Sequence, residues 1–230
     1  MTHCADPQPV KSLRKRLPWA LACLGLCTGG LLIQHGMDAP TPPPQPSAAE
    51  GFTSVEAAPA VGEVAATSAP PKVPAMAPAT PTRVRITAIG VNAPLTALAL
   101  QSNGHLAAPT ESNRNLAGWY RNGTAPGAAG TAVIAGHVDT QAGPAVFYNL
   151  GALKKGMTVD VDRADHTTAV FSIDEVVAYS ASEFPSRKVY GGTTQPELRL
   201  ITCGAGFDKA RHEYLGNVVV YAHLTAARKL

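Results

Sequence analysis

The sequence predicts a mainly β domain, folded as a closed or nearly closed, mostly antiparallel barrel with one or two short helices. From Pro81 to Leu230, short runs rich in β-branched residues alternate with turn-forming pairs such as Asn122-Gly123 and Gly191-Gly192. Long helical periodicity is absent from this region. At this chain length, such a pattern of short strands and turns suggests a closed or nearly closed barrel.

Each predicted strand is an apolar or alternating run bounded by turn residues. The main strands are Arg83–Ile89, Thr131–His137, Thr158–Asp162, Ala169–Tyr179, Leu198–Cys203 and Asn217–Leu224. Weaker signals lie near Leu95–Leu100 and at His105, and Ala145–Leu150 is the best candidate for a short helix. No repeat of fixed period is visible.

The N-terminal part predicts a membrane anchor followed by a tether. Residues 1–16 carry four basic residues near their end, and an uncharged run from Leu17 to Ile33 follows directly. We expect residues 17–35 to span the membrane once, with the N-terminus cytoplasmic and the remainder exported. A cleaved signal peptide is the alternative, and Ala20-Leu21-Ala22-Cys23 faintly resembles a lipoprotein cleavage site.

Residues 36–80 are rich in Pro, Ala, Ser and Thr and nearly free of aromatic residues. Such a composition cannot bury enough apolar area to offset its ordering entropy, so it predicts a disordered, extended stalk before a domain spanning residues 81–230. The formal net charge is +3, and the basic residues are scattered apart from the N-terminal cluster. This distribution argues against a nucleic-acid partner.

Cys203 is the single cysteine on the exported side, and it ends an apolar strand before Gly204. A lone exported thiol is either buried and inert or kept free for chemistry. Its position at a strand end, followed by small residues, favours a nucleophile that a substrate backbone can approach. A thiol nucleophile needs a base or a positive charge nearby. His137 is the best candidate, since it too follows a strand that ends in glycine, at Gly136.

The segments AVIAGHVDT (residues 132–140) and LRLITCG, with FD and NVVVYA following it, resemble the sortases, cysteine transpeptidases of Gram-positive cell surfaces. The likeness is greatest to the class F sortases of high-GC actinobacteria and extends from about Thr82 to Leu224, including GWYRNGTAPGAAG at residues 118–130. It implies an eight-stranded barrel in which Cys203 attacks an LPXTG-like sorting signal of a surface protein. The resemblance further implies that a covalent acyl-enzyme forms and that its acyl group is then transferred to an amine of a peptidoglycan precursor or a pilin. No metal or organic cofactor is required.

The resemblance also implies an arginine that holds the substrate and stabilises the oxyanion. Its usual position, about a dozen residues after the cysteine, holds Leu215, Gly216 and Asn217 in this chain. We therefore take Arg211, in the loop before the last strand, as the candidate, with Arg121 and Arg187 as alternatives; Arg199 lies too far along the strand from Cys203.

The remaining candidate residues flank this predicted site. Asp139 is a candidate for orienting His137, or else a turn former. Trp119, Tyr120, Thr202 and Gly204 are candidates for the substrate groove, although the aromatic residues also suit a barrel core, and Thr202 also suits the opposite face of its strand. Two alternative functions stay open: a non-catalytic, sortase-like surface-binding module, and an L,D-transpeptidase, whose Ser-x-Gly-Cys-x-Arg motif does not match the residues before Cys203.

Overall fold

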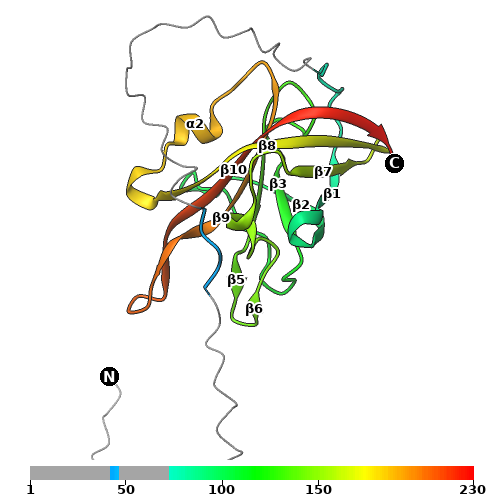
Figure 1. The fold of residues 1–230 in the computed structure, drawn as a ribbon. Helices are drawn as coiled ribbons and strands as arrows, with labels where there is room; N and C mark the ends of the chain where they lie inside the picture. The colour runs from blue at the N-terminus through cyan, green and yellow to red at the C-terminus, as the bar shows by residue number, and fades with distance from the viewer. Residues whose placement is uncertain (1–41, 47–72) are drawn as a thin grey trace, which may run out of the picture. The chain divides into compact units, whose positions relative to one another are not determined.

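The computed structural model describes residues 42–46 and 73–230, and the predicted anchor at residues 17–35 lies outside them. Among the described residues, no helix is both long and apolar enough to cross a membrane. The described chain forms a closed barrel of eight strands in the order β1-β2-β3-β4-β9-β10-β8-β7 (Figure 1). The barrel strands are β1 (Pro81–Ile86), β2 (Val91–Leu98), β3 (Ala117–Tyr120), β4 (Gly130–Gly136), β7 (Thr158–Arg163), β8 (Thr167–Ser180), β9 (Pro196–Asp208) and β10 (Glu213–Lys229).

The remaining elements are short. A two-stranded sheet of β5 (Asp139–Thr140) and β6 (Gly143–Pro144) follows β4, and one α-helix, α2 (Ser186–Tyr190), lies between β8 and β9. Three 3-10 turns complete the described elements: η1 (Thr87–Ile89), η2 (Leu150–Ala152) and η3 (Ala181–Glu183). The mainly β barrel is confirmed, with small differences from the expected elements. The first strand ends at Ile86, β3 was not foreseen, and a 3-10 turn at Leu150–Ala152 replaces the expected helix at 145–150.

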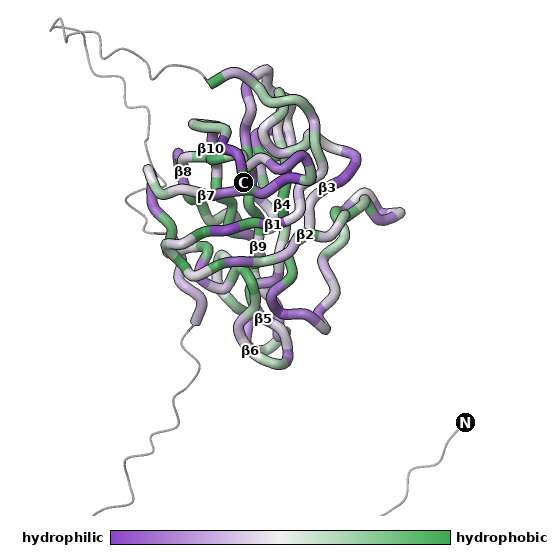
Figure 2. The backbone as a smooth tube through the Cα atoms, turned by 90° about the vertical axis from the view of Figure 1, so that its right-hand side faces the viewer, coloured by the Kyte–Doolittle hydropathy of each residue, from purple (hydrophilic) through white to green (hydrophobic). Residues whose placement is uncertain are grey.

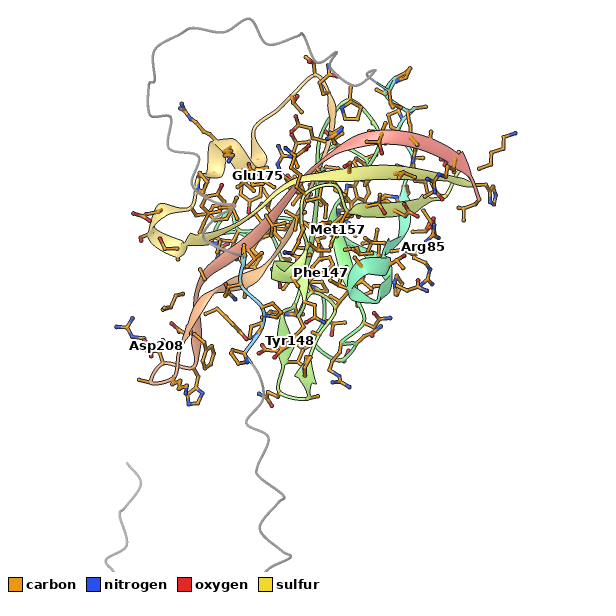
Figure 3. The ribbon with its side chains drawn as sticks, in the orientation of Figure 1. Arg85, Phe147, Tyr148, Met157, Glu175 and Asp208 are labelled. Carbon is orange, nitrogen blue, oxygen red and sulfur yellow. The ribbon has the colours of Figure 1, made fainter. Side chains whose placement is uncertain are left out.

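Apolar side chains fill the barrel because alternate residues of each strand point inward. Leu198 and Leu200 of β9 are fully buried in the main core, together with Ile134 of β4 and Phe147. Phe147 is labelled within the barrel in Figure 3. Figure 2 shows apolar stretches of chain, in green, within the central strands, such as those labelled β9 and β4.

A second apolar cluster covers the outer surface of the same strands. Val133, Ile201, Val219 and Tyr221 pack there with Val189 of α2. Ile201 lies on the face of β9 opposite to Leu200, and strand alternation places Cys203 on the same outer face as Ile201. The sheet at β4, β9 and β10 therefore has apolar packing on both sides.

Residues 73–80, which the sequence analysis assigned to the stalk, pack against the barrel. The backbone N–H of Met76 donates to the carbonyl of Gly127 at 2.8 Å, and Ala164 N–H donates to the carbonyl of Thr80, also at 2.8 Å. The buried guanidinium of Arg163 donates to the carbonyl of Ala77. The folded unit therefore begins before Pro81, and residues 73–80 are part of it.

Candidate active site

The parallel pairing of β4 with β9 brings the two principal candidates together. These strands are adjacent in the barrel, and Ala135 pairs with Ile201. Continuing this register by two residues places His137 beside Cys203 on the outer face. The hydroxyl of Thr202 donates to the carbonyl of Gly136 at 2.9 Å, which ties the two strand ends together.

His137 is half-buried, and both its imidazole and its backbone are held by hydrogen bonds. Its Nε2 lies 2.8 Å from the carbonyl oxygen of Pro109. A carbonyl can only accept a hydrogen bond, so Nε2 carries a proton in this arrangement. The backbone carbonyl of His137 accepts a bond from Phe147 N–H at 3.0 Å.

Cys203 is a free, solvent-accessible thiol. Protein atoms nevertheless surround the sulfur closely enough that desolvation, with a further contribution from the negative charge of Asp139, raises the pKa of the Cys203 thiol. The thiol is therefore protonated at neutral pH. Attack on a carbonyl requires its proton to leave, and the neighbouring imidazole is the group able to accept it.

Asp139 faces the β9–β10 hairpin. Its carboxylate accepts a hydrogen bond from the hydroxyl of Tyr214 at 2.5 Å. Desolvation, this bond and the carboxylate charge raise the pKa of Tyr214, so the phenol stays protonated. The recorded ring contact of His137 is with Pro109, and a role for Asp139 in orienting that ring stays a prediction. Tyr214 and Pro109 were not among the residues singled out from the sequence, because neither lies in a recognisable motif.

The candidate arginine lies away from this cluster. Arg211 sits in the turn of the β9–β10 hairpin, where its side chain is 76% exposed and its Nε lies 3.7 Å from Asp208. Figure 3 labels Asp208 near the tip of this hairpin, apart from Phe147. Arg199 is buried, ion-paired with Glu197, and stacked on the ring of Tyr221 at 4.5 Å.

The residue directly opposite Cys203 on β10 is Asn217. Its Nδ2 donates to the carbonyl of Thr202 at 3.3 Å. The position that the family resemblance assigns to an arginine thus holds a neutral amide that faces the same side of the sheet as the thiol. Arg121 and Arg187 are both exposed in loop or helix positions.

A cavity of about 940 Å³ lies along the outer face of these strands. Its lining includes Val133 of β4, Tyr120 of β3 and Asn217, the residue opposite Cys203 on β10. Its walls come from the 100–106 loop and from the 181–193 segment: Leu100, Gly104, His105, Leu106, Ala181, Phe184, Ser186, Tyr190, Gly192 and Thr193. The cavity is large enough for a short peptide, and it approaches the thiol through Asn217, since neither Cys203 nor His137 lines it.

The four predicted groove residues occupy different environments. Tyr120 lines the cavity, whereas Trp119 packs against the main core and donates its indole N–H to the carbonyl of Thr124 at 2.9 Å. The Thr202 hydroxyl is buried and engaged with Gly136. Gly204 is buried, and a Cβ built there would lie 2.6 Å from Cγ2 of Val218, so a side chain at this position would have to push the Val218 side chain aside.

Comparison with known proteins identifies the family of the domain. A sortase domain model matches residues 84–225, more than half of the chain. Sortase A from Listeria monocytogenes superimposes with a TM-score of 0.50 at 19% identity, covering 66% of this chain and 91% of that one. Sortase C-1 from Actinomyces oris gives a TM-score of 0.49 at 18% identity, covering 63% and 73%. No curated protein matches the sequence.

The chain forms a closed eight-stranded barrel, and the sortase domain model matches it over residues 84–225. Both findings favour a sortase over an L,D-transpeptidase. The protein belongs to the sortase family.

Proposed function

We propose that this chain is a membrane-anchored cysteine transpeptidase, of the class F type, that cleaves an LPXTG-like sorting signal and transfers the acyl group to an amine. The observation that supports it is the β4–β9 register, which sets His137 beside Cys203. The substrates are surface proteins with a C-terminal sorting signal. The acceptor is an amine of a peptidoglycan precursor or a pilin, and the single-pass anchor at residues 17–35 holds the domain outside the cell.

The chemistry follows from the protonation states. His137 removes the proton of Cys203, and the thiolate attacks the scissile carbonyl carbon to form a tetrahedral oxyanion. The C–N bond breaks as the imidazolium donates its proton to the departing amine, which leaves a thioester on Cys203. An acceptor amine then attacks the thioester, its proton passes to His137, and the thiolate leaves. A water molecule in place of the amine gives hydrolysis.

The oxyanion needs donors near the sulfur. Arg211 is the candidate from the sequence, but it lies in the exposed turn of the β9–β10 hairpin, away from Cys203. We propose that Asn217 contributes a donor in its place, because it lies opposite Cys203 and lines the cavity. A neutral amide stabilises an oxyanion less than a guanidinium does. We therefore expect slow turnover relative to an arginine-bearing site.

The test uses the full chain in detergent, incubated with an LPXTG-type peptide and triglycine and followed by mass spectrometry. We expect an acyl adduct on Cys203 and a triglycine-transfer product. Cys203→Ala should abolish both, His137→Ala should reduce both strongly, and the control Cys4→Ala should leave both unchanged. Asn217→Ala slowing acylation more than Arg211→Ala would favour Asn217 as the donor. No adduct with a panel of peptide variants would favour a non-catalytic binding module instead.

A further inference from the structure

The helix α2 forms part of one wall of the cavity and packs on the outer face of the sheet. Ser186 and Tyr190 of α2 line the cavity, whereas Val189 is fully buried in the outer cluster together with Tyr221 of β10. α2 has only five residues, and a helix this short is not stable by itself. The position of this wall therefore depends on the contacts that α2 makes with the sheet.

Tyr221 lies in a row of residues that crosses the outer face of four strands. It pairs with Glu175 of β8 on one side and with Arg199 of β9 on the other. Arg199 in turn pairs with Val133 of β4, which lines the cavity. Directly paired residues share one face of a sheet, so the four side chains lie side by side. Tyr221 is itself 5% exposed and is not among the residues that line the cavity.

Two cations stack on the ring of Tyr221. The guanidinium carbon of Arg199 lies 4.5 Å from the ring centroid, and Nζ of Lys188, from α2, lies 4.7 Å from it. Cations within about 6 Å of a ring centroid are attracted to its face. Nζ of Lys188 also lies 2.7 Å from the carboxylate of Glu175, which Figure 3 labels close to α2. The ring of Tyr221 therefore connects the helix with the sheet.

Arg199 shows what the ring supplies to its neighbours. Its side chain is 8% exposed, and its Nε has no hydrogen-bond partner within the described part of the structure. An unpaired buried polar group is costly, and stacking of the delocalised guanidinium on an aromatic face offsets part of that cost. Removing the ring would thus loosen the sheet side of this contact as well as the helix side.

The hydroxyl of Tyr221 reaches the same wall by a second route. It lies 3.1 Å from the hydroxyl of Tyr179 on β8, and the ring of Tyr179 makes an edge contact with Phe184 at 6.1 Å. Phe184 lines the cavity and contacts the ring of Tyr190 at 5.8 Å. Desolvation and the bond to Tyr179 raise the pKa of Tyr221, so its phenol stays protonated. Both ends of the Tyr221 side chain therefore support the wall.

We propose that Tyr221 is a positioning residue of the peptide cavity, which holds α2 through Lys188 and holds Phe184 through Tyr179. Without these contacts, α2 leaves the sheet more often. Peptide binds well only to the fraction of molecules in which the wall is in place, so its apparent affinity falls with that fraction. The strand ends that carry the reacting pair do not depend on Tyr221, so the maximal rate is retained. The effect on peptide rests on the proposed function, whereas the docking of α2 does not.

Docking of α2 is tested by hydrogen exchange at the Val189 amide, which donates to the carbonyl of Pro185 at 3.0 Å. Exchange is measured by NMR on the full chain in detergent. Lys188→Met removes the cation and keeps an apolar stem, and it should lower the protection factor of this amide about three- to tenfold. Lys188→Arg should keep the protection. Tyr221→Leu should lower it further, and Tyr221→Phe, which keeps the ring, should lower it less than Tyr221→Leu does.

The matched control is Phe171→Leu, which also removes a buried ring, but from the main core. It should lower Tm without changing the protection of Val189. Lys188→Met should have a smaller effect in the Tyr221→Leu chain than in the native chain, because the ring is already absent. Equal effects in both chains, or unchanged protection in Lys188→Met, would overturn the proposal. Lys188 is half-exposed, so this variant decides even where Tyr221→Leu does not fold.

The consequence for peptide is measured by single-turnover acylation over a range of LPXTG-type peptide concentrations. Tyr221→Leu should raise the concentration for half-maximal rate about fivefold or more, with a maximal rate within about twofold of the native one. A lower maximal rate with unchanged half-saturation would overturn the positioning role. If no chain forms an adduct, the proposed function fails. Slower exchange at Val189 on addition of peptide would then still establish the wall, and unchanged exchange would overturn it.

Discussion

Replacing Thr202 with valine separates the stability of the barrel from the alignment of its site. The Thr202 side chain is 4% exposed, and its hydroxyl donates to the carbonyl of Gly136, the residue before His137. Valine has a similar shape but cannot donate, so a buried carbonyl loses a partner at a cost of about 1–2 kcal/mol in the free energy of unfolding. For a domain of this size, the expected fall in Tm is about 2–8 °C.

Thr202→Val also removes the hydrogen bond to Gly136 that connects the ends of β4 and β9, where His137 and Cys203 lie. Small misplacements of reacting groups have large effects on rate, so we expect peptide acylation to slow about tenfold or more under conditions where the chain stays folded. Thr202→Ser keeps the hydroxyl and should recover most of the rate. Unfolding in urea gives the stability, and single-turnover acylation followed by mass spectrometry gives the rate.

Thr168→Val is the matched control. Thr168 is also 4% exposed, and its hydroxyl donates to Asp162 at 2.8 Å, on the β7–β8 side of the barrel. It should lose comparable stability while keeping its acylation rate. If Thr202→Val slows acylation no more than Thr168→Val does, the bond to Gly136 does not align the site, and the reasoning is refuted.

Three further predictions concern the site and its support. Because desolvation and Asp139 raise the pKa of the Cys203 thiol, its alkylation by iodoacetamide should keep rising with pH after that of free cysteine has levelled off. Asp139→Asn removes the charge and should move this profile to lower pH; an unmoved profile would exclude the electrostatic coupling. Tyr120→Ala should raise the peptide concentration needed for half-maximal acylation with little change in Tm, because Tyr120 lines the cavity, whereas Trp119→Ala should cost about 3 kcal/mol of folding stability, because Trp119 packs on the core. If urea unfolding shows the larger stability loss for Tyr120→Ala, and peptide titration shows the larger effect for Trp119→Ala, these assignments are wrong. Arg163→Met removes the buried donor to Ala77 and should make the segment around residue 77 open to limited proteolysis, with a Tm loss of several degrees; equal protease resistance in both chains would contradict the role of Arg163 in holding residues 73–80.

The strands that carry the site were the most predictable part of the fold. Leu198–Cys203 and Thr131–His137 are apolar runs that end at glycine, and such runs suit strands packed on both faces. The short strand β3 was missed because AGWY offers four residues with no alternation. The length of β9 was underestimated because Gly204 and Gly206 read as a loop, whereas the structure places them around a bulge within the strand.

The packing of residues 42–46 and 73–80 on the barrel could not be predicted from the sequence, for a different reason. Proline-rich composition indicates that a segment does not fold by itself, but it does not show whether a neighbouring surface binds it. The contacts of Gln45 with Ala205 and of Met76 with Gly127 depend on groups far away in the chain. The hydrogen bond from Tyr214 to Asp139 could not be predicted from the sequence either, because it forms only after folding brings the β5–β6 and β9–β10 hairpins together.

The parallel arrangement of β4 and β9 has a consequence for how such a site can change over time. The spacing of His137 from Cys203 is set by two neighbouring backbones, and about sixty residues of intervening chain, including β7, β8 and α2, do not determine it. Segments such as 181–193 contribute walls of the cavity without setting that spacing. Under the proposed function, insertions or replacements in those walls can therefore redirect the choice of peptide without rebuilding the chemistry.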